Sequence, residues 1–159
     1  MVFLIIILLF TSIFFSGSET ALTAVDKVKL QARVQDGDKK AAKLLGIVSN
    51  PGEFITTILI GNNIANILLP TVVTAMAIDY GWSVAIASAA LTVTIILFAE
   101  VIPKSIAAAF PEQISNIVRP PITLIIIIFK PLTLILNFIT DNITTVSYTH
   151  LTLPTILLV

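Results

Sequence analysis

Apolar residues dominate the chain in four long stretches, which short polar segments separate. Residues 1–24, 62–78 and 83–108 are close to the length of about 20 residues that an α-helix needs to cross a membrane. The first stretch lacks the basic region and the small-residue cleavage site of a signal peptide, so we expect a retained helix. The pattern predicts an all-α integral membrane protein.

Composition agrees with this class and argues against several others. Of the 159 residues, 57% are hydrophobic and 11% are charged, whereas a soluble domain has roughly 25% charged residues. The net charge is zero, which gives no support to nucleic-acid binding, and the absence of cysteine excludes disulfides and thiolate metal sites. No Ser/His arrangement, pair of aspartates or H-E-x-x-H motif indicates an intramembrane enzyme, so we expect a protein that is not an enzyme.

The distribution of charge predicts the orientation in the membrane. Residues 26–50 form the only markedly polar stretch, and we expect them to form a cytoplasmic helical loop. Most of the basic residues lie there, namely Lys27, Lys29, Arg33, Lys39, Lys40 and Lys43. The positive-inside rule places this loop in the cytoplasm and the N-terminus outside. Tyr80 and Trp82, in a short loop without Lys or Arg, fit the outer aromatic belt.

The segment before the second stretch allows two interpretations. Residues 51–61 form either a short re-entrant half-helix or the first turns of a helix that continues through residues 62–78. We favour a break at Gly61, Asn62 and Asn63, because glycine offers a flexible joint and irregular backbone at this depth can line a cavity.

The last apolar segment is also open to two interpretations. Residues 120–139 are apolar enough to cross the membrane, but Lys130 and Pro131 interrupt them. We favour two short juxtamembrane helices in residues 110–140, lying along the inner membrane surface with a hinge at these two residues. This leaves three spanning helices and a cytoplasmic C-terminus. Residues 146–159 show no helical periodicity, are either disordered or foreign to the natural chain, and have no assigned function.

Polar side chains interrupt three of the apolar stretches and suggest one shared site. A carboxylate at membrane depth, such as Glu100, costs about 2.5–3.5 kcal/mol on insertion scales and usually faces a cavity. Ser12 and Ser16 share one helix face, and Asn62 and Asn66 are likewise four residues apart. Carboxylate, hydroxyl and amide oxygens suit Mg²⁺, Ca²⁺ or Na⁺ rather than zinc or copper. The residues alone do not choose among these ions.

Each of these signals also has a structural interpretation. Hydroxyls in membrane helices often bond to the carbonyl one turn back, and asparagines often join two helices. Glu100 can form a buried ion pair with Lys104, one turn later. Pro103 argues for a cation site, because it leaves the carbonyl of Ala99 without its intrahelical partner and available as a ligand.

Three motifs in this order resemble one family. The sequences FFSGSETAL at residues 14–22, GNNIAN at residues 61–66 and FAEVIPK at residues 98–104 are similar to the transmembrane domain of the CorC/CNNM family of magnesium transporters, also called the DUF21 domain. The resemblance covers residues 1–140 and ends after about residue 145.

The resemblance implies a homodimer in the lipid bilayer of the plasma (inner) membrane. Each protomer would have three transmembrane helices, a short re-entrant helical pair and a juxtamembrane helical belt. It would export Mg²⁺, driven by Na⁺ entry, from one site per protomer. The expected metal ligands are Ser12, Ser16, Asn62 or Asn63, Glu100 and backbone carbonyls near Pro103. The expected supporting residues are Gly17, Gly61, Asn66, Pro103 and Lys104.

Two further expectations concern regulation and the rival function. Family members usually continue into ATP-binding CBS domains and a further C-terminal domain, which this sequence lacks, so we expect regulation by such domains in a full-length protein. The rival function from another class is a non-transporting divalent-cation sensor or a dimeric membrane scaffold, in which the same residues bind an ion to stabilise the dimer.

Overall fold

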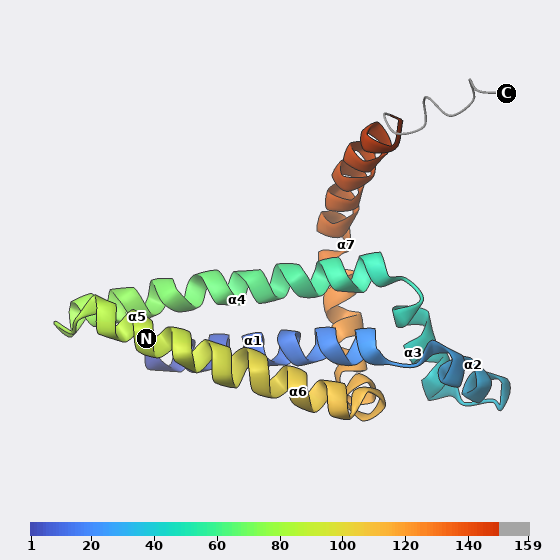
Figure 1. Cartoon of the computed structure of the whole chain (residues 1–159), viewed down its shortest axis with the longest axis horizontal. Helices are drawn as coiled ribbons and strands as arrows, with labels where there is room; N and C mark the ends of the chain where they lie inside the picture. Colours follow the sequence, from blue (N-terminus) through green and yellow to red (C-terminus); the bar gives the residue numbers. More distant parts are fainter. Residues whose placement is uncertain (150–159) are drawn as a thin grey trace, which may run out of the picture.

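A computed structural model describes the backbone of residues 1–149, with side chains placed up to Leu136 and at Phe138. This part of the chain is helical throughout, apart from short turns (Figure 1). The elements are α1 (Val2–Ala24), α2 (Lys27–Gln35), α3 (Lys39–Val48), α4 (Pro51–Asp79), α5 (Val84–Thr94), the π-helix η1 (Ile95–Val101), α6 (Ile102–Ala109) and α7 (Pro111–Thr149).

Helices α1, α4 and the continuous rod α5–η1–α6 run alongside one another, and α7 runs across them (Figure 1). The crossing lies where α1 and α6 end and α4 begins, with the small helices α2 and α3 beyond it. Within the described residues, four helices are long and apolar enough to cross a membrane: Val2–Ala24, Pro51–Asp79, Val84–Ala109 and Pro111–Leu136. The chain is therefore a multi-pass membrane protein, in which α7 differs in direction from the other three candidates.

The main hydrophobic core lies at the crossing. Buried side chains of α1, α2, α3, α4 and α7 form it, including Phe15, Leu22, Leu44, Ile58 and Ile122. The side chains of Asp26 and Asp38 cap α2 and α3 by accepting hydrogen bonds from backbone N–H groups in the first turn of each helix, as N-cap residues commonly do.

The predicted break at Gly61 is not present, because α4 is one continuous helix of 29 residues. The glycine serves close packing instead. It is buried, and a Cβ atom added to it would lie 2.3 Å from the Phe15 ring of α1. Residues 51–61 and 62–78 therefore belong to one helix, and the structure does not contain the short re-entrant helix that we favoured.

The predicted hinge at Lys130 and Pro131 is also absent, since α7 continues through its internal prolines. An internal proline weakens a helix by about 3 kcal/mol, but α7 packs against both α1 and α4, with Val118, Ile122 and Thr133 buried. This packing on either side of the prolines explains why the helix is continuous. Residues 146–149 extend α7, whereas residues 150–159 of the predicted tail lie outside the described residues.

Candidate cation site

Oxygen atoms from α1 and α4 converge in the middle of the bundle. The Ser12 hydroxyl, which is fully buried, lies 2.8 Å from Asn66 Oδ1 and 3.3 Å from Asn62 Oδ1. Asn62 and Asn66 face α1 together because they are separated by one helical turn. The close approach of the two helices at Gly61 and Phe15 brings these three polar side chains within reach of one another.

Both amides are turned so that their oxygens face Ser12, which leaves three oxygens and one hydroxyl hydrogen between them. A serine hydroxyl carries one hydrogen, so Ser12 can donate to only one of the two amide oxygens at a time. The second amide oxygen then faces the Ser12 oxygen without a hydrogen between them. Such a set of uncharged oxygens can be satisfied by a hard cation, which accepts hydroxyl and amide carbonyl ligands.

Ser16 adds a second oxygen on the same face of α1. Its hydroxyl is fully buried and has no hydrogen-bond partner among the described residues. Leaving a buried polar group unpaired costs about 1–3 kcal/mol, so an unpaired hydroxyl one turn from Ser12 requires an explanation. Other hydroxyls of α1 follow the structural interpretation, because Ser18 and Thr20 donate to carbonyls one turn back.

Glu100 lies in the π-helix η1, which packs against α1. The wide turn has a local cause: Pro103 has no N–H to offer the carbonyl of Ala99, and its ring crowds that carbonyl. The chain responds with bonds of the i→i+5 type, such as that from the N–H of Ile102 to the carbonyl of Leu97. π-Turns occur frequently at functional sites.

The rod meets α1 at Gly17 and Pro103. A Cβ atom added to Gly17 would lie 3.6 Å from the Pro103 Cβ and 3.8 Å from the Pro103 carbonyl oxygen. This contact places the turn that carries Ser16 beside the turn that follows Glu100. Glu100 itself is half-buried, and no hydrogen bond or ion pair within the described residues joins it to Ser12 or Ser16.

Two predicted site residues behave differently from the expectation. Asn63 is exposed and has no hydrogen bond to Ser12, whereas Asn66, predicted only as a supporting residue, makes the shorter bond. In the described part of the chain, Glu100 forms no ion pair with Lys104, so the structural interpretation of this carboxylate is not observed. The described residues also contain no group of three or more His, Cys, Asp or Glu side chains that could hold a metal.

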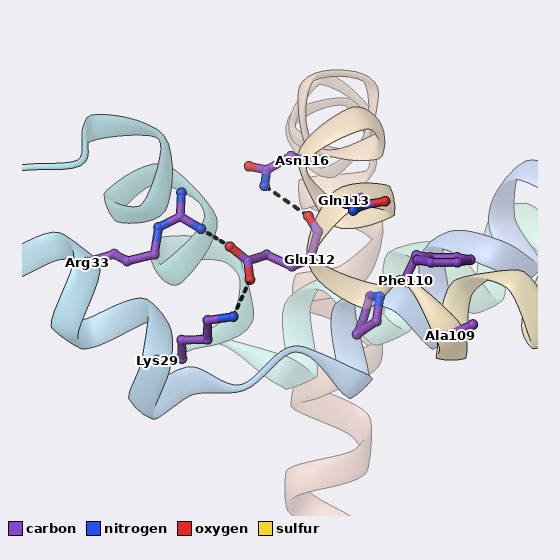
Figure 2. Close-up of a pocket in the computed structure, with 8 residues that line it drawn as sticks. Lys29, Arg33, Ala109, Phe110, Glu112, Gln113 and Asn116 are labelled. Carbon is purple, nitrogen blue, oxygen red and sulfur yellow. Dashed lines mark hydrogen bonds and ion pairs between the residues drawn. The ribbon is translucent and has the colours of Figure 1, made fainter.

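Two features of the structure were not predicted from the sequence. One is the π-helix, for which Pro103, three residues after Glu100, was the available signal. The other is a group of ion pairs around Glu112, where α2 approaches the start of α7 (Figure 2). No signal in the sequence could have paired these charges, because they belong to segments that are far apart along the chain.

Comparison with known proteins gives the context for this arrangement. The family model described as "Cyclin M transmembrane N-terminal domain" matches residues 3–152, which includes part of the segment 146–159 that was left unassigned. The UPF0053 inner membrane protein YfjD of Escherichia coli is 37% identical over 134 residues, covering 81% of this chain and 31% of that protein.

Other relatives have similar coverage. A UPF0053 protein of Haemophilus influenzae is 35% identical over 87% of this chain and 34% of its own length. The polyamine export protein of Salmonella typhimurium is 30% identical over 89% of this chain and 35% of its own length. The chain thus spans about a third of the length of these relatives. From the match over residues 3–152, the chain belongs to the CNNM family as its transmembrane domain.

Proposed function

We propose that this membrane domain exports Mg²⁺ in exchange for Na⁺ through an all-oxygen site at membrane depth. The single observation that carries the proposal is the convergence of Ser12, Asn62 and Asn66 beside the unpaired hydroxyl of Ser16. Glu100, on the neighbouring rod, supplies the one carboxylate, for which Mg²⁺ and Na⁺ compete. Mg²⁺ loses its water reluctantly, so neutral oxygens that replace part of the hydration shell are needed for passage.

The proposal includes an arrangement in the membrane. α1, α4 and the rod α5–η1–α6 span the bilayer, and α7 lies along the inner surface, which its direction across the other helices supports. The N-terminus is then outside, and α2 and α3 are cytoplasmic, in agreement with their lysines. The protein acts as a homodimer in the plasma (inner) membrane, and regulatory CBS domains are expected in the full-length protein.

A second cargo is suggested by relatives that are named polyamine export proteins. Hydroxyl and amide oxygens also accept hydrogen bonds from ammonium groups. A long polyamine has several charges spaced along its length, however, and the described residues contain no group of three or more acidic side chains that could match them. We therefore place Mg²⁺ first.

Binding and flux measurements test the proposal. Titration calorimetry on the purified protein should give an affinity for Mg²⁺ that Glu100→Gln weakens by about tenfold or more, since ligand charge sets affinity in such sites. Asp79→Asn, which removes an exposed acid at the end of α4, is the matched control and should bind as the parent does. Equal affinity in the Glu100→Gln variant and the parent would rule out this site.

Flux separates the remaining functions. In liposomes that contain the protein, Na⁺ moving down its gradient should drive Mg²⁺ in the opposite direction. The Glu100→Gln variant should show no such transport. Binding without flux favours the sensor or scaffold. Transport of spermidine without transport of Mg²⁺ would replace the proposed cargo with a polyamine.

A further inference from the structure

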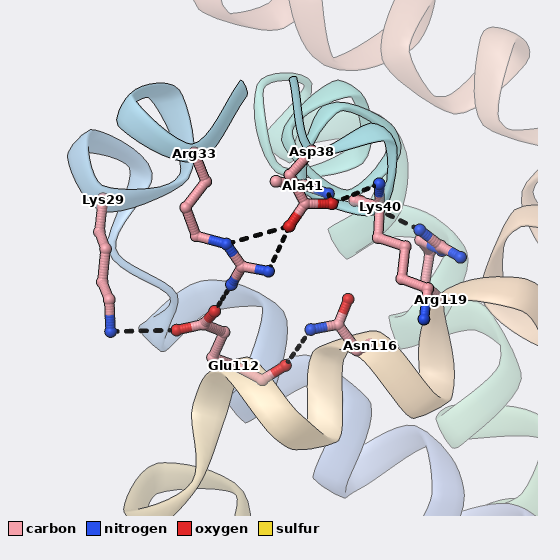
Figure 3. Close-up of polar contacts among 8 residues, drawn as sticks. All are labelled: Lys29, Arg33, Asp38, Lys40, Ala41, Glu112, Asn116 and Arg119. Atoms are coloured by element: carbon pink, nitrogen blue, oxygen red, sulfur yellow. Dashed lines mark hydrogen bonds and ion pairs between the residues drawn. The ribbon is translucent and has the colours of Figure 1, made fainter. Parts of the chain in front are cut away.

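Arg33 of α2 connects three elements at the end of the bundle where α7 crosses (Figure 3). Its Nε and Nη2 atoms donate to Asp38 Oδ2 at 3.1 and 2.5 Å, and its Nη1 atom donates to Glu112 of α7. Because Asp38 caps α3, the single guanidinium group joins α2, α3 and the first turn of α7. A planar guanidinium with several donors is suited to hold two carboxylates at once.

Neighbouring contacts reinforce this connection. Lys29 Nζ lies 3.2 Å from the second oxygen of Glu112, so the carboxylate is held by two cations of α2. Farther along α7, Arg119 donates to the carbonyl of Lys40 at 3.0 Å. Arg33 and Glu112 are about two-thirds shielded from solvent, with side-chain exposures of 36% and 31%, whereas Lys29 is 66% exposed. The Arg33–Glu112 pair is therefore the better shielded of the two.

Ion pairs join α2 to the first turn of α7, beside the core in which Leu30 of α2 and Val118 and Ile122 of α7 are buried. A cleft of about 500 Å³ lies on one side of Glu112, lined by Arg33, Phe110 and Asn116 among others (Figure 2). A second cleft of about 250 Å³, lined by Val25 and Leu30 among others, also borders Glu112. The ion pairs therefore lie beside open space, and they hold α2 to the start of α7 in addition to the packing of Leu30 in the core.

The position of these charges along the chain relates them to the candidate site. α2 follows α1 after two residues, and α7 follows α6 after Phe110 alone. α1 carries Ser12 and Ser16, and the rod that ends in α6 carries Glu100. The Arg33–Glu112 pair therefore joins the continuations of the two helices that contribute to the site, on the cytoplasmic side of their contact at Gly17 and Pro103.

We propose that Arg33 is a positioning residue and that the Arg33–Glu112 pair is a latch, which holds α1 and α6 together at the cytoplasmic end and must open for an ion to pass between that end and the site. The role of the latch as an ion gate rests on the proposed transport function. The latch itself is a conformational contact, so it can be tested without any ion.

Thiol labelling measures whether this end of the bundle is open. The chain has no cysteine, and Ala107 of α6 is 1% exposed, so Ala107→Cys reports on opening through its rate of reaction with a charged, membrane-impermeant maleimide. In the full chain in lipid nanodiscs without Mg²⁺, Arg33→Glu should raise this rate roughly tenfold, because repulsion from Glu112 and Asp38 replaces two attractions.

Three variants complete the test. Glu112→Arg should raise the labelling rate as Arg33→Glu does, and the double variant should react about threefold more slowly than either single variant, because it restores one ion pair. Lys43→Glu makes the same charge change on α3 at an exposed residue that has no ion pair among the described residues, and should react like the parent. Equal rates in Arg33→Glu, Glu112→Arg and the parent would overturn the proposal.

Folding is checked by thermal unfolding of each variant. Where Arg33→Glu does not fold, Arg33→Lys and Glu112→Gln replace it, and parental labelling rates in both of these overturn the latch. Failure of the latch can be distinguished from failure of the proposed transport function. A latch that responds as expected in a protein that binds no Mg²⁺ disproves the ion site alone, whereas normal Mg²⁺ binding with unchanged labelling disproves the latch alone.

Discussion

The ring of Phe15 packs against the backbone of Gly61 with its far end, so closely that a Cβ atom on Gly61 would be 2.3 Å from the Phe15 Cζ atom. This contact fixes the spacing between α1 and α4, and with it the distance from Ser12 to Asn62 and Asn66. Gly61→Ala should therefore destabilise the protein by about 1–3 kcal/mol, as overpacking of a core does, since Phe15 is buried in the main core and has little room to move. Thermal unfolding in detergent measures the loss.

A matched glycine provides the control for this prediction. Gly46 of α3 is exposed and a Cβ atom there would meet nothing within 4 Å, so Gly46→Ala should raise stability by about 0.5–1 kcal/mol through helix propensity. In Gly61→Ala, shortening the ring by Phe15→Leu should recover part of the loss. Equal stability of Gly61→Ala and the parent would show that the ring can move aside freely.

The two neighbouring amides, Asn63 and Asn66, should differ in their effect on Mg²⁺ binding. Asn66→Ala removes the oxygen nearest the Ser12 hydroxyl and should weaken the affinity for Mg²⁺ by about tenfold. Asn63→Ala removes the same chemical group from an exposed position and should leave the affinity for Mg²⁺ unchanged. Titration calorimetry measures the affinity of both variants for Mg²⁺. A larger loss in Asn63→Ala than in Asn66→Ala would make Asn63, and not Asn66, the ligand.

Pro103 should act in opposite directions on stability and on ion binding. Pro103→Ala restores a backbone donor to Ala99 and should allow η1 to become α-helical, which raises stability by up to about 3 kcal/mol. Loss of the wide turn changes the direction in which Glu100 points, so the affinity for Mg²⁺ should fall. Pro131→Ala is the control, because the exposed Pro131 lies in α7, which remains helical around it, and should raise stability without a change in affinity.

Asp38 should make the α2–α3 hairpin sensitive to acid. The hydrogen bond from Arg33, followed by those from the backbone N–H groups of Ala41 and Lys40, lowers the pKa of Asp38 from its usual value of 3.8. A lowered pKa in the folded state means that the stabilisation is fully present above about pH 3.8, and is lost as the pH falls through the lower folded value. Thermal unfolding between pH 6 and pH 2.5 should show this loss.

Two substitutions separate the parts that Asp38 plays. Asp38→Asn keeps a side-chain oxygen that can cap α3 but loses the charge that Arg33 binds, so it should weaken the acid dependence while retaining the helix. Asp38→Ala loses both and should be the less stable of the two near neutral pH. An acid dependence in Asp38→Asn that matches the parent would assign the titration to another carboxylate.

The sequence was sufficient to predict the membrane class, the helices in residues 26–50 and the shared helix faces of Ser12 with Ser16 and of Asn62 with Asn66, because apolar length and four-residue spacing are local signals. It failed at Gly61 and at Pro131. A glycine in a helix indicates either a joint or a close approach, and only the position of Phe15 on another helix decides between them. The continuity of α7 similarly depends on its packing against α1 and α4.

Pairings between distant segments could not be predicted in the same way. The ion pair between Arg33 and Glu112 depends on the direction in which α7 leaves α6, which no local pattern specifies. The preference for Asn66 over Asn63 depends on which face of α4 meets α1. Both follow from the arrangement of complete helices, not from the residues beside them.

The rod α5–η1–α6 contributes no side chain to the main hydrophobic core and meets α1 through small residues, with Ala99 and Ala107 as its buried positions. Glycine and alanine have no rotamers to rearrange when two helices shift against each other. A change in tilt of this rod therefore requires little repacking, whereas α1 and α4 are fixed by interlocking large side chains. Among the described helices, this rod is the one in which a rocking motion meets the least resistance.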